Sequence, residues 1–299
     1  MKMDTKKIPQ GDSPVVRRKI RPGVVLASLA AAFITYALLG IVFHDDIIYP
    51  FDQTPFRAPG GEQHIVDGDI PVTIFKAEQD SDVIFYLQGN VASRSSFAED
   101  ILAHHAAGYT VVTMNWSGSE GRPGDVSEAL LKSEALSVMN AIPKLIGDDD
   151  PSIHIHGYSM GSGIASFVAS QTEPETLILQ SSYSSLCRVM SGKTFLPACY
   201  LPGIETWDNM QYVAQIKAPV FMLHGLNDAL IPSKYALELA KELASQDKIL
   251  QVKTYENVGH NDFWKVDNIA DIHKFIRTQN AKPDIPSQED LQDLFSPHN

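Results

Sequence analysis

The segment Gly157-Tyr-Ser-Met-Gly161 holds the residues best suited to chemistry, because it fits the pattern G-x-S-x-G. A β-branched run at 152–157 comes before the serine, and an apolar helical pattern at 160–171 comes after it. In this context the pattern forms a sharp turn that lifts a serine hydroxyl above the edge of a sheet. Glycines flank the serine because a Cβ there would collide with neighbouring backbone. We therefore predict that Ser159 is a nucleophile.

A serine hydroxyl needs a general base, and the base needs an acid that orients it. Asp228 follows the apolar run 219–224, and His260 stands in a Gly-His-Asn turn after the alternating run 248–256. The chain order of nucleophile, acid and histidine is the order found in hydrolases with this turn. The sequence therefore predicts a triad of Ser159, Asp228 and His260.

Other acids and histidines compete for these roles. Asp262 is an alternative to Asp228, but it stands only two residues after His260 and cannot easily reach the Nδ1 side of the imidazole. His224 is expected to support the loop that carries Asp228. The remaining candidates are assigned to structural or surface positions: His154, His156, Asp247 and Glu256.

The negative oxygen of a tetrahedral intermediate needs two hydrogen-bond donors. One donor is expected to be the backbone N–H of Met160, the residue after the nucleophile. The other should come from the loop after the third strand, where Gly89-Asn90 follows the apolar run 82–88. The backbone N–H groups of Met160 and Asn90 are thus predicted to form an oxyanion hole.

From about Ile48 to Arg277 the chain resembles the Bem46-like group of α/β hydrolases, the membrane-anchored serine hydrolases of the ABHD type. The resemblance implies a hydrolase with a Ser-Asp-His triad that acts on an ester, a thioester or an amide. It rests on five motifs in the group's order: Tyr86-Leu-Gln-Gly-Asn-Val91, Ser119-Glu-Gly-Arg-Pro123, Gly157-Tyr-Ser-Met-Gly161, His224-Gly-Leu-Asn-Asp-Ala-Leu-Ile-Pro232 and Gly259-His-Asn-Asp262.

Two segments depart from the group's pattern. Gln88 stands where the group usually has a histidine, and Met114-Asn-Trp-Ser117 stands where it usually has R-G-Y-G. Both departures concern the details of the expected oxyanion pocket and leave the triad pattern intact.

Strand and helix patterns alternate along the chain, which predicts an α/β fold with a mostly parallel, doubly wound eight-stranded sheet. An antiparallel entry hairpin is expected at 62–66 and 70–77. The other predicted strands are 82–88, 110–116, 152–157, 176–181, 219–224 and 248–256. The predicted helices are 94–107, 126–146, 160–171, 232–245 and 262–278.

Charge is distributed unevenly over the 299 residues. The net charge is −12, and the first 43 residues carry about +5, so the remaining residues carry about −17. Such an acidic body repels the phosphate backbone of DNA or RNA, which argues against a nucleic-acid partner.

Residues 23–43 form an uncharged apolar run of 21 residues. As a helix it would be about 30 Å long, which matches the core of a bilayer. Basic residues precede the run and acidic residues follow it, so the positive-inside rule places the N-terminus in the cytoplasm and the rest of the chain on the other side. We expect an uncleaved transmembrane anchor. A cleavable signal peptide is the alternative, although its apolar region would be shorter.

The expected organisation has four parts: a basic cytoplasmic tail at 1–22, the anchor at 23–43, an α/β-hydrolase domain at 44–279 and a loose polar tail at 280–299. Within the hydrolase domain, an insertion at about 183–217 is expected to be a lid rich in apolar side chains. Such a lid over a triad would suit an acyl chain, and the alternative is that its side chains only pack the insertion onto the domain.

The insertion also carries the chain's two cysteines, Cys187 and Cys199. They form either a disulfide in an oxidising compartment or two buried thiols, and both interpretations stay open. No cluster of residues has the spacing of metal ligands, so neither a metal nor a cofactor is predicted. The sequence gives no indication of the oligomeric state.

These features predict a membrane-anchored serine hydrolase that cleaves carboxylic esters or thioesters of lipid or acyl substrates. Two alternatives stay open. One is a serine peptidase of the prolyl-oligopeptidase or proline-iminopeptidase type. The other is a non-catalytic, membrane-tethered binding protein built on a hydrolase fold.

Overall fold

The computed structural model describes residues 22–78, 81–90, 94–278 and 285–296, and the chain divides into two compact units, 1–42 and 43–299. In the first unit, helix α1 (Pro22–Val42) has a mean hydropathy of 2.3 and no buried side chain. Among the described residues it is the one helix long and apolar enough to cross a membrane. A signal sequence near the N-terminus would have the same length and composition. The predicted basic tail lies almost wholly outside the described residues.

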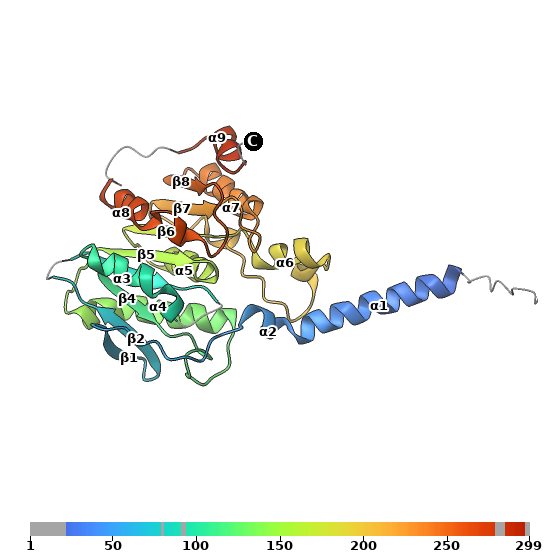
Figure 1. Cartoon of the computed structure of the whole chain (residues 1–299), viewed down its shortest axis with the longest axis horizontal. Coiled ribbons are helices and arrows are strands. Elements are labelled where there is room, and N and C mark those ends of the chain that lie inside the picture. The colour runs from blue at the N-terminus through green and yellow to red at the C-terminus, as the bar shows by residue number, and fades with distance from the viewer. Residues whose placement is uncertain (1–21, 79–80, 91–93, 279–284, 297–299) are drawn as a thin grey trace, which may run out of the picture. The chain divides into compact units, whose positions relative to one another are not determined.

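The second unit, residues 43–299, is built around a twisted sheet of eight strands in its described part (Figure 1). The strand order is β1-β2-β4-β3-β5-β6-β7-β8. Strands β1 and β2 pair antiparallel, as do β2 and β4, and all other neighbouring pairs are parallel. The predicted eight-stranded, mostly parallel sheet is confirmed. Its strands are β1 (Glu62–Val66), β2 (Ile70–Phe75), β3 (Val83–Leu87), β4 (Thr110–Met114), β5 (Ile153–Tyr158), β6 (Thr176–Gln180), β7 (Val220–Gly225) and β8 (Leu250–Tyr255).

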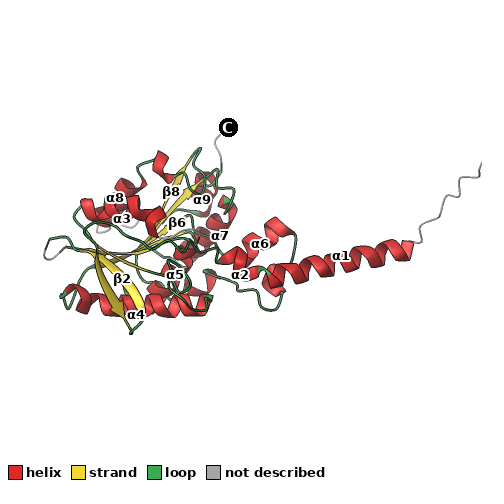
Figure 2. Ribbon diagram, turned by 60° about the horizontal axis from the view of Figure 1, so that its bottom comes forward, coloured by secondary structure: helices red, strands yellow, loops and turns green. Residues whose placement is uncertain are grey.

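Helices cover both faces of this sheet, as Figure 2 shows. One face packs against α4 (Glu128–Ile146), α5 (Met160–Gln171) and α7 (Ser233–Ser245) through a large aliphatic core. The other face packs against α3 (Ala98–Ala106) and α8 (Asn268–Thr278) through a smaller, more aromatic core. Every residue of the central strands β3, β5 and β6 is buried, because helices lie on both sides of them.

Helix boundaries differ from the predictions in small ways. The helix predicted at 94–107 begins as a 3-10 turn, η1 (Arg94–Phe97), before α3. The helix predicted at 262–278 is divided into η4 (Phe263–Lys265) and α8. Ser127 caps α4 by accepting a hydrogen bond from the backbone N–H of Leu130, and for this reason the helix begins at Glu128.

The expectation of a loose tail at 280–299 is wrong for its described part. Residues 288–294 form α9 (Gln288–Leu294), which Ser287 and Asp290 cap reciprocally. Leu291 and Phe295 are buried in the larger core, and α9 packs against α7 and β8. The segment is mostly polar, so the sequence did not indicate a helix. Leu291 and Phe295 are four positions apart and therefore fall on one face of a helix.

The connector after residue 43 also contains a helix that was not predicted, α2 (His44–Ile48). Ile48 is buried while Ile47 is 57% exposed. Five residues give too short a pattern for a helical period to be recognised in the sequence.

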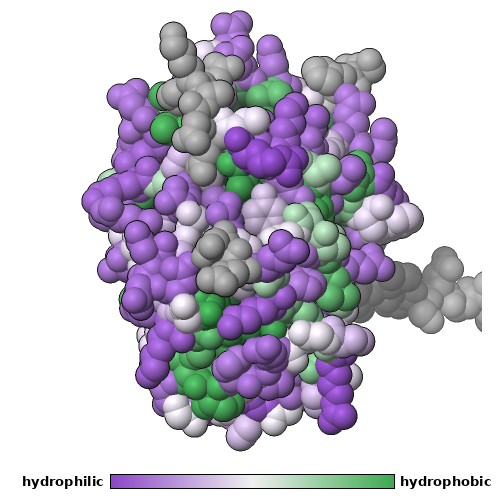
Figure 3. Space-filling view, turned by 90° about the vertical axis from the view of Figure 1, so that its left-hand side faces the viewer, coloured by the Kyte–Doolittle hydropathy of each residue, from purple (hydrophilic) through white to green (hydrophobic). Residues whose placement is uncertain are grey.

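The predicted lid contains α6 (Leu186–Thr194) and two 3-10 turns, η2 (Ala198–Tyr200) and η3 (Met210–Tyr212). A disulfide joins Cys187 in α6 to Cys199 in η2, so the structure adopts the first of the two interpretations left open by the sequence. The face of the protein drawn in Figure 3 is largely hydrophilic, with smaller hydrophobic areas.

Candidate active site

The turn between β5 and α5 holds Ser159 in a strained backbone conformation, with φ of 52° and ψ of −120°. A Cβ on Gly161 would lie 2.0 Å from the carbonyl oxygen of Leu87, and one on Gly157 would lie 2.5 Å from that of Gly161. Both positions therefore require glycine. The close packing of β3, β5 and α5 that these glycines allow places the Ser159 side chain at the end of the sheet, where a partner side chain can reach it.

The structure brings the three predicted triad residues together. The Ser159 Oγ lies 2.9 Å from the Nε2 of His260, and the Nδ1 of His260 lies 2.7 Å from the Oδ2 of Asp228. All three residues are at most 8% exposed. This geometry allows His260 to accept a proton from the serine while the carboxylate of Asp228 holds the other ring nitrogen.

Asp228 is fixed by its own loop. Its Oδ1 accepts hydrogen bonds from the backbone N–H groups of Leu230, at 2.9 Å, and Ile231, at 2.7 Å. One carboxylate oxygen is thus used by the backbone, and the other faces His260. His224 lies against the same loop, where its Nε2 is 3.0 Å from the carbonyl oxygen of Ile231, in agreement with its expected supporting role.

The competing residues lie elsewhere. Asp262 accepts a hydrogen bond from the backbone N–H of Gly259 and pairs with Lys265 at 3.0 Å. These contacts hold the pKa of Asp262 below its usual value. Both Asp247 and Glu256 are exposed, and the ring of His154 lies 2.8 Å from the hydroxyl of Thr176. None of these contacts involves the serine.

The two predicted oxyanion residues both border Ser159. Met160 begins α5, and Asn90 follows Gly89, whose added Cβ would lie 3.3 Å from the Cβ of Ser159. The side-chain amide of Asn90 donates a hydrogen bond of 2.8 Å to the carbonyl oxygen of Ile48 in α2. This contact was not predicted, because α2 was not.

Gln88, which replaces the histidine of the resembled group, is 1% exposed and does not open to solvent. Its Nε2 donates a hydrogen bond of 3.0 Å to the carbonyl oxygen of Met114. The departure at Gln88 thus serves to fasten the end of β3 to the end of β4, just below the expected oxyanion loop.

A cavity of about 140 Å³ opens beside the serine, and Ser159, Asn90 and Met160 all line it. Its other walls are almost entirely apolar. They come from three separate parts of the chain, which are α2 (Ile47, Ile48), the predicted lid segment (Tyr183, Leu186, Val189, Met190, Lys193) and the loop after Asp228 (Leu230, Ile231).

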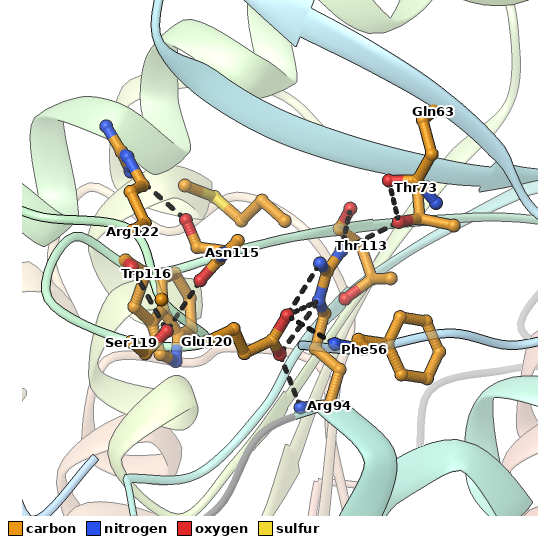
Figure 4. A network of polar contacts seen from close by, with 12 residues as sticks. Phe56, Gln63, Thr73, Arg94, Thr113, Asn115, Trp116, Ser119, Glu120 and Arg122 are labelled. Carbon is orange, nitrogen blue, oxygen red and sulfur yellow. Dashed lines mark hydrogen bonds and ion pairs between the residues drawn. The ribbon is translucent and has the colours of Figure 1, made fainter. Parts of the chain in front are cut away.

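A buried ion pair that sequence reasoning missed supports this region (Figure 4). The guanidinium of Arg94 contacts Glu120 at 2.9 Å, and the two side chains are 3% and 2% exposed. Glu120 also accepts hydrogen bonds from the backbone N–H groups of Arg94, at 2.7 Å, and of Phe56, at 3.2 Å. The pair ties the loop after β4 to the start of η1. Glu120 stands inside one of the five motifs, whereas the sequence gives no signal for Arg94.

A second missed feature is a chain of buried histidines beneath the turn. The Nδ1 of His104 lies 2.9 Å from the Nε2 of His273, and its Nε2 lies 3.0 Å from the Nδ1 of His156. The Nε2 of His156 lies 2.9 Å from the side-chain oxygen of Gln180. The backbone carbonyl of Gln180 in turn accepts the N–H of Ser159. Burial lowers the pKa of His156 to about 3 and that of His273 to about 4. These rings are therefore neutral at physiological pH.

Within the described ranges no group of three or more His, Cys, Asp or Glu side chains is placed to hold a metal ion.

This architecture is similar to that of known proteins. A model of the dienelactone hydrolase family matches residues 128–274. An esterase of Pyrococcus furiosus superposes with a TM-score of 0.61 at 14% identity, covering 77% of this chain and 98% of the esterase. The chain has the α/β-hydrolase fold.

A lipase and a peptidase are also similar to this chain. The lysophosphatidylserine lipase ABHD12 of Danio rerio is 28% identical over 228 residues, which cover 69% of this chain and 57% of that protein. An acylaminoacyl peptidase of Pyrococcus horikoshii has a TM-score of 0.63 at 16% identity, over 80% of this chain and 45% of the peptidase. The chain spans less than two thirds of the length of the curated relatives it matches.

Proposed function

We propose that this α/β hydrolase is a serine hydrolase that cleaves carboxylic esters or thioesters of acyl or lipid substrates. The observation that carries the proposal is the hydrogen-bonded chain from Ser159 through His260 to Asp228, at the edge of an apolar cavity. A Ser-His-Asp arrangement performs acyl transfer on several unrelated folds, because its geometry activates a hydroxyl at neutral pH.

In the proposed mechanism, His260 takes the proton from the Oγ of Ser159 as this oxygen attacks the acyl carbonyl. Asp228 keeps the imidazole in the required tautomer and stabilises the imidazolium. The backbone N–H groups of Met160 and Asn90 bind the developing oxyanion. His260 then donates its proton to the leaving group, and the acyl group stays on the serine.

A water molecule completes the cycle. His260 accepts a proton from the water as it attacks the acyl-enzyme, and it returns this proton to the Oγ of Ser159 when the acid leaves. These steps need no group beyond those of the site.

The proposed substrate class follows from the lining of the cavity. Leu186, Val189 and Met190 of α6 face the serine across it, and apolar walls of this kind bind acyl chains better than charged termini. The one lysine of the lining, Lys193, donates a hydrogen bond of 2.7 Å to the carbonyl oxygen of Ala229. The name of the relative ABHD12 supports a lipid substrate. The peptidase likeness, at 16% identity, supports the fold alone.

We also propose that α1 is an uncleaved anchor, with the N-terminus in the cytoplasm and the hydrolase domain on the other side of the membrane. The length and hydropathy of α1 and the basic residues before it support this topology. The Cys187–Cys199 disulfide supports an oxidising compartment for the domain. The mass of the protein purified from membranes tests it, since a chain that lacks residues 1–43 would show cleavage of a signal peptide.

The activity is tested with a graded series of acyl esters, from acetyl to palmitoyl, on the full chain in detergent. We expect hydrolysis that increases towards longer chains and is lost in Ser159→Ala. Ser133→Ala, which changes a serine on the exposed side of α4, is the matched control and should keep full activity. Hydrolysis that survives in Ser159→Ala would overturn the proposal.

A further inference from the structure

The short helix α2 is an integral part of the cavity wall beside the serine. Ile47 and Ile48 both line the cavity, together with α6 and the loop after Asp228. Only residues 43–46 separate Ile47 from Val42, the last residue of α1. The cavity wall therefore begins five residues along the sequence after the end of α1.

Polar contacts at both ends hold α2 against the lid. The backbone N–H of Glu205 donates a hydrogen bond of 3.3 Å to the Nε2 of His44, which is 1% exposed. The hydroxyl of Tyr49 donates a hydrogen bond to the carboxylate of Glu205, whose other oxygen accepts the backbone N–H of Glu128 at 2.7 Å. These contacts fix α2 relative to the lid and to the start of α4.

At its last residue α2 also contacts the expected oxyanion loop. The carbonyl oxygen of Ile48 accepts the side-chain N–H of Asn90 at 2.8 Å. A carbonyl near the end of a helix has no partner within the helix, so this bond satisfies a group that would otherwise need water. The same five-residue helix thus borders both the apolar cavity and the oxyanion loop.

The lining divides into a floor and a mouth. Met160, Tyr183 and Ile48 are at most 3% exposed and form the floor. Ile47 is 57% exposed and Leu230 is 45% exposed, so these two side chains flank the mouth. An engineered apolar cavity of about 150 Å³ binds one benzene ring, so the 140 Å³ found here accommodates about six carbon atoms. A longer acyl chain would leave the cavity through this mouth, between the side chains of Ile47 and Leu230.

We propose that α2 forms the outer wall of the acyl-binding site and that Ile47 sets the selectivity for acyl-chain length. This inference rests on the proposed function, since it assumes that Ser159 forms the acyl-enzyme. It gives residues 44–48 a direct role in substrate selection, in addition to joining α1 to the hydrolase domain.

The test compares Ile47→Trp with Ile65→Trp in the full chain. Ile65 is an isoleucine of β1 that is 59% exposed and lies outside the cavity lining, so it is a matched control for the size and exposure of the new indole. We expect Ile47→Trp to lower kcat/KM at least tenfold for decanoyl and longer esters. For acetyl and butyryl esters the change should stay within twofold, and Ile65→Trp should leave the whole series unchanged.

Two results would overturn the inference. In one, Ile47→Trp and Ile65→Trp give the same chain-length profile. In the other, Ile47→Trp lowers activity equally for all chain lengths, which would indicate a general defect and not a blocked mouth. Ser159→Ala, measured in parallel, separates the two proposals. If Ser159→Ala loses activity while Ile47→Trp gives either of these two results, the serine mechanism stands and only the role of α2 is overturned.

Discussion

The triad and the cavity beside it are built in opposite ways. In the predicted triad, hydrogen bonds join Ser159 to His260 and His260 to Asp228. The other carboxylate oxygen of Asp228 accepts two backbone N–H groups. Apart from Ser159, Asn90 and Met160, the cavity is lined mainly by apolar side chains that come from three parts of the chain. We expect changes in the triad to act in an all-or-none manner. Changes in the cavity should shift substrate preference in small steps.

The largest effect is expected from Asp228→Asn. The two backbone N–H groups at Oδ1 require an acceptor, so the amide would turn its oxygen towards them and its NH₂ towards His260. An NH₂ facing Nδ1 favours the wrong imidazole tautomer, and kcat should fall about 10⁴-fold, as such replacements do in other triads. Steady-state kinetics on a short-chain ester measures this, and a loss of less than tenfold would count against the role of Asp228.

The second effect concerns the framework that supports the site. Glu120→Gln removes one charge of a buried pair and leaves the guanidinium of Arg94 without a counter-charge. The free energy of unfolding should fall by about 3–5 kcal/mol. Urea unfolding followed by circular dichroism measures the change. Glu173→Gln, which breaks the exposed pair with Lys217, is the control and should have a much smaller effect. Equal effects of the two variants would contradict the supporting role.

The third effect is a dependence of stability on pH that arises from the buried histidines. Burial depresses the pKa of His156 to about 3 and that of His273 to about 4, compared with about 6.5 in an unfolded chain. Between pH 6.5 and 4 the unfolded state binds more protons, so the free energy of unfolding should fall as pH falls, by up to about 1.4 kcal/mol per pH unit for each histidine.

Unfolding in urea at several pH values tests this account. His273→Gln should give a smaller decrease in stability between pH 6.5 and 4.5 than the unchanged protein. His64→Gln, at a partly exposed position in β1, should follow the unchanged protein. If the free energy of unfolding falls equally with pH in both variants, the pH dependence does not arise from the buried histidines.

The smallest effect is expected in the cavity. Met190 is a partly buried residue of α6 that lines the cavity, and Met190→Ala removes part of its surface for contact with an acyl chain. Contact of this kind stabilises the ground state and the transition state alike, so KM for an octanoyl ester should rise about three- to tenfold with kcat unchanged. Met210→Ala alters a methionine outside this cavity and should change neither constant. A fall in kcat alone would place Met190 in a different role.

The difference between the two regions also explains what the sequence predicts. The turn around Ser159 is local, because glycines at fixed offsets and a strand-to-helix change are visible in a few residues. Asp228 and His260 could be predicted because each follows a strand, and the parallel sheet brings strand ends to one edge. These sequence signals stay close to the residues they predict, and the structure places the three side chains within hydrogen-bond distance.

The cavity wall and the framework could not be predicted in the same way. Ile47 and Met190 are more than 140 positions apart, and no local pattern links α2 to the lid. Arg94 and Glu120 pair through tertiary contact, as do His104, His156 and His273. A single sequence carries no signal for such pairs. Leu291 in α9 and Phe295 directly after it are surrounded by polar residues in the sequence, and a seven-residue helix has too few turns to show a clear apolar period.

The central claim is that Ser159 carries the acyl group during turnover. The most direct measurement is acid quenching of the full chain during hydrolysis of an octanoyl ester, followed by peptide mass spectrometry. The account predicts an octanoyl adduct on the peptide that contains Ser159, and no adduct in Ser159→Ala. Turnover with no adduct on Ser159, or an adduct on a different residue, would contradict it.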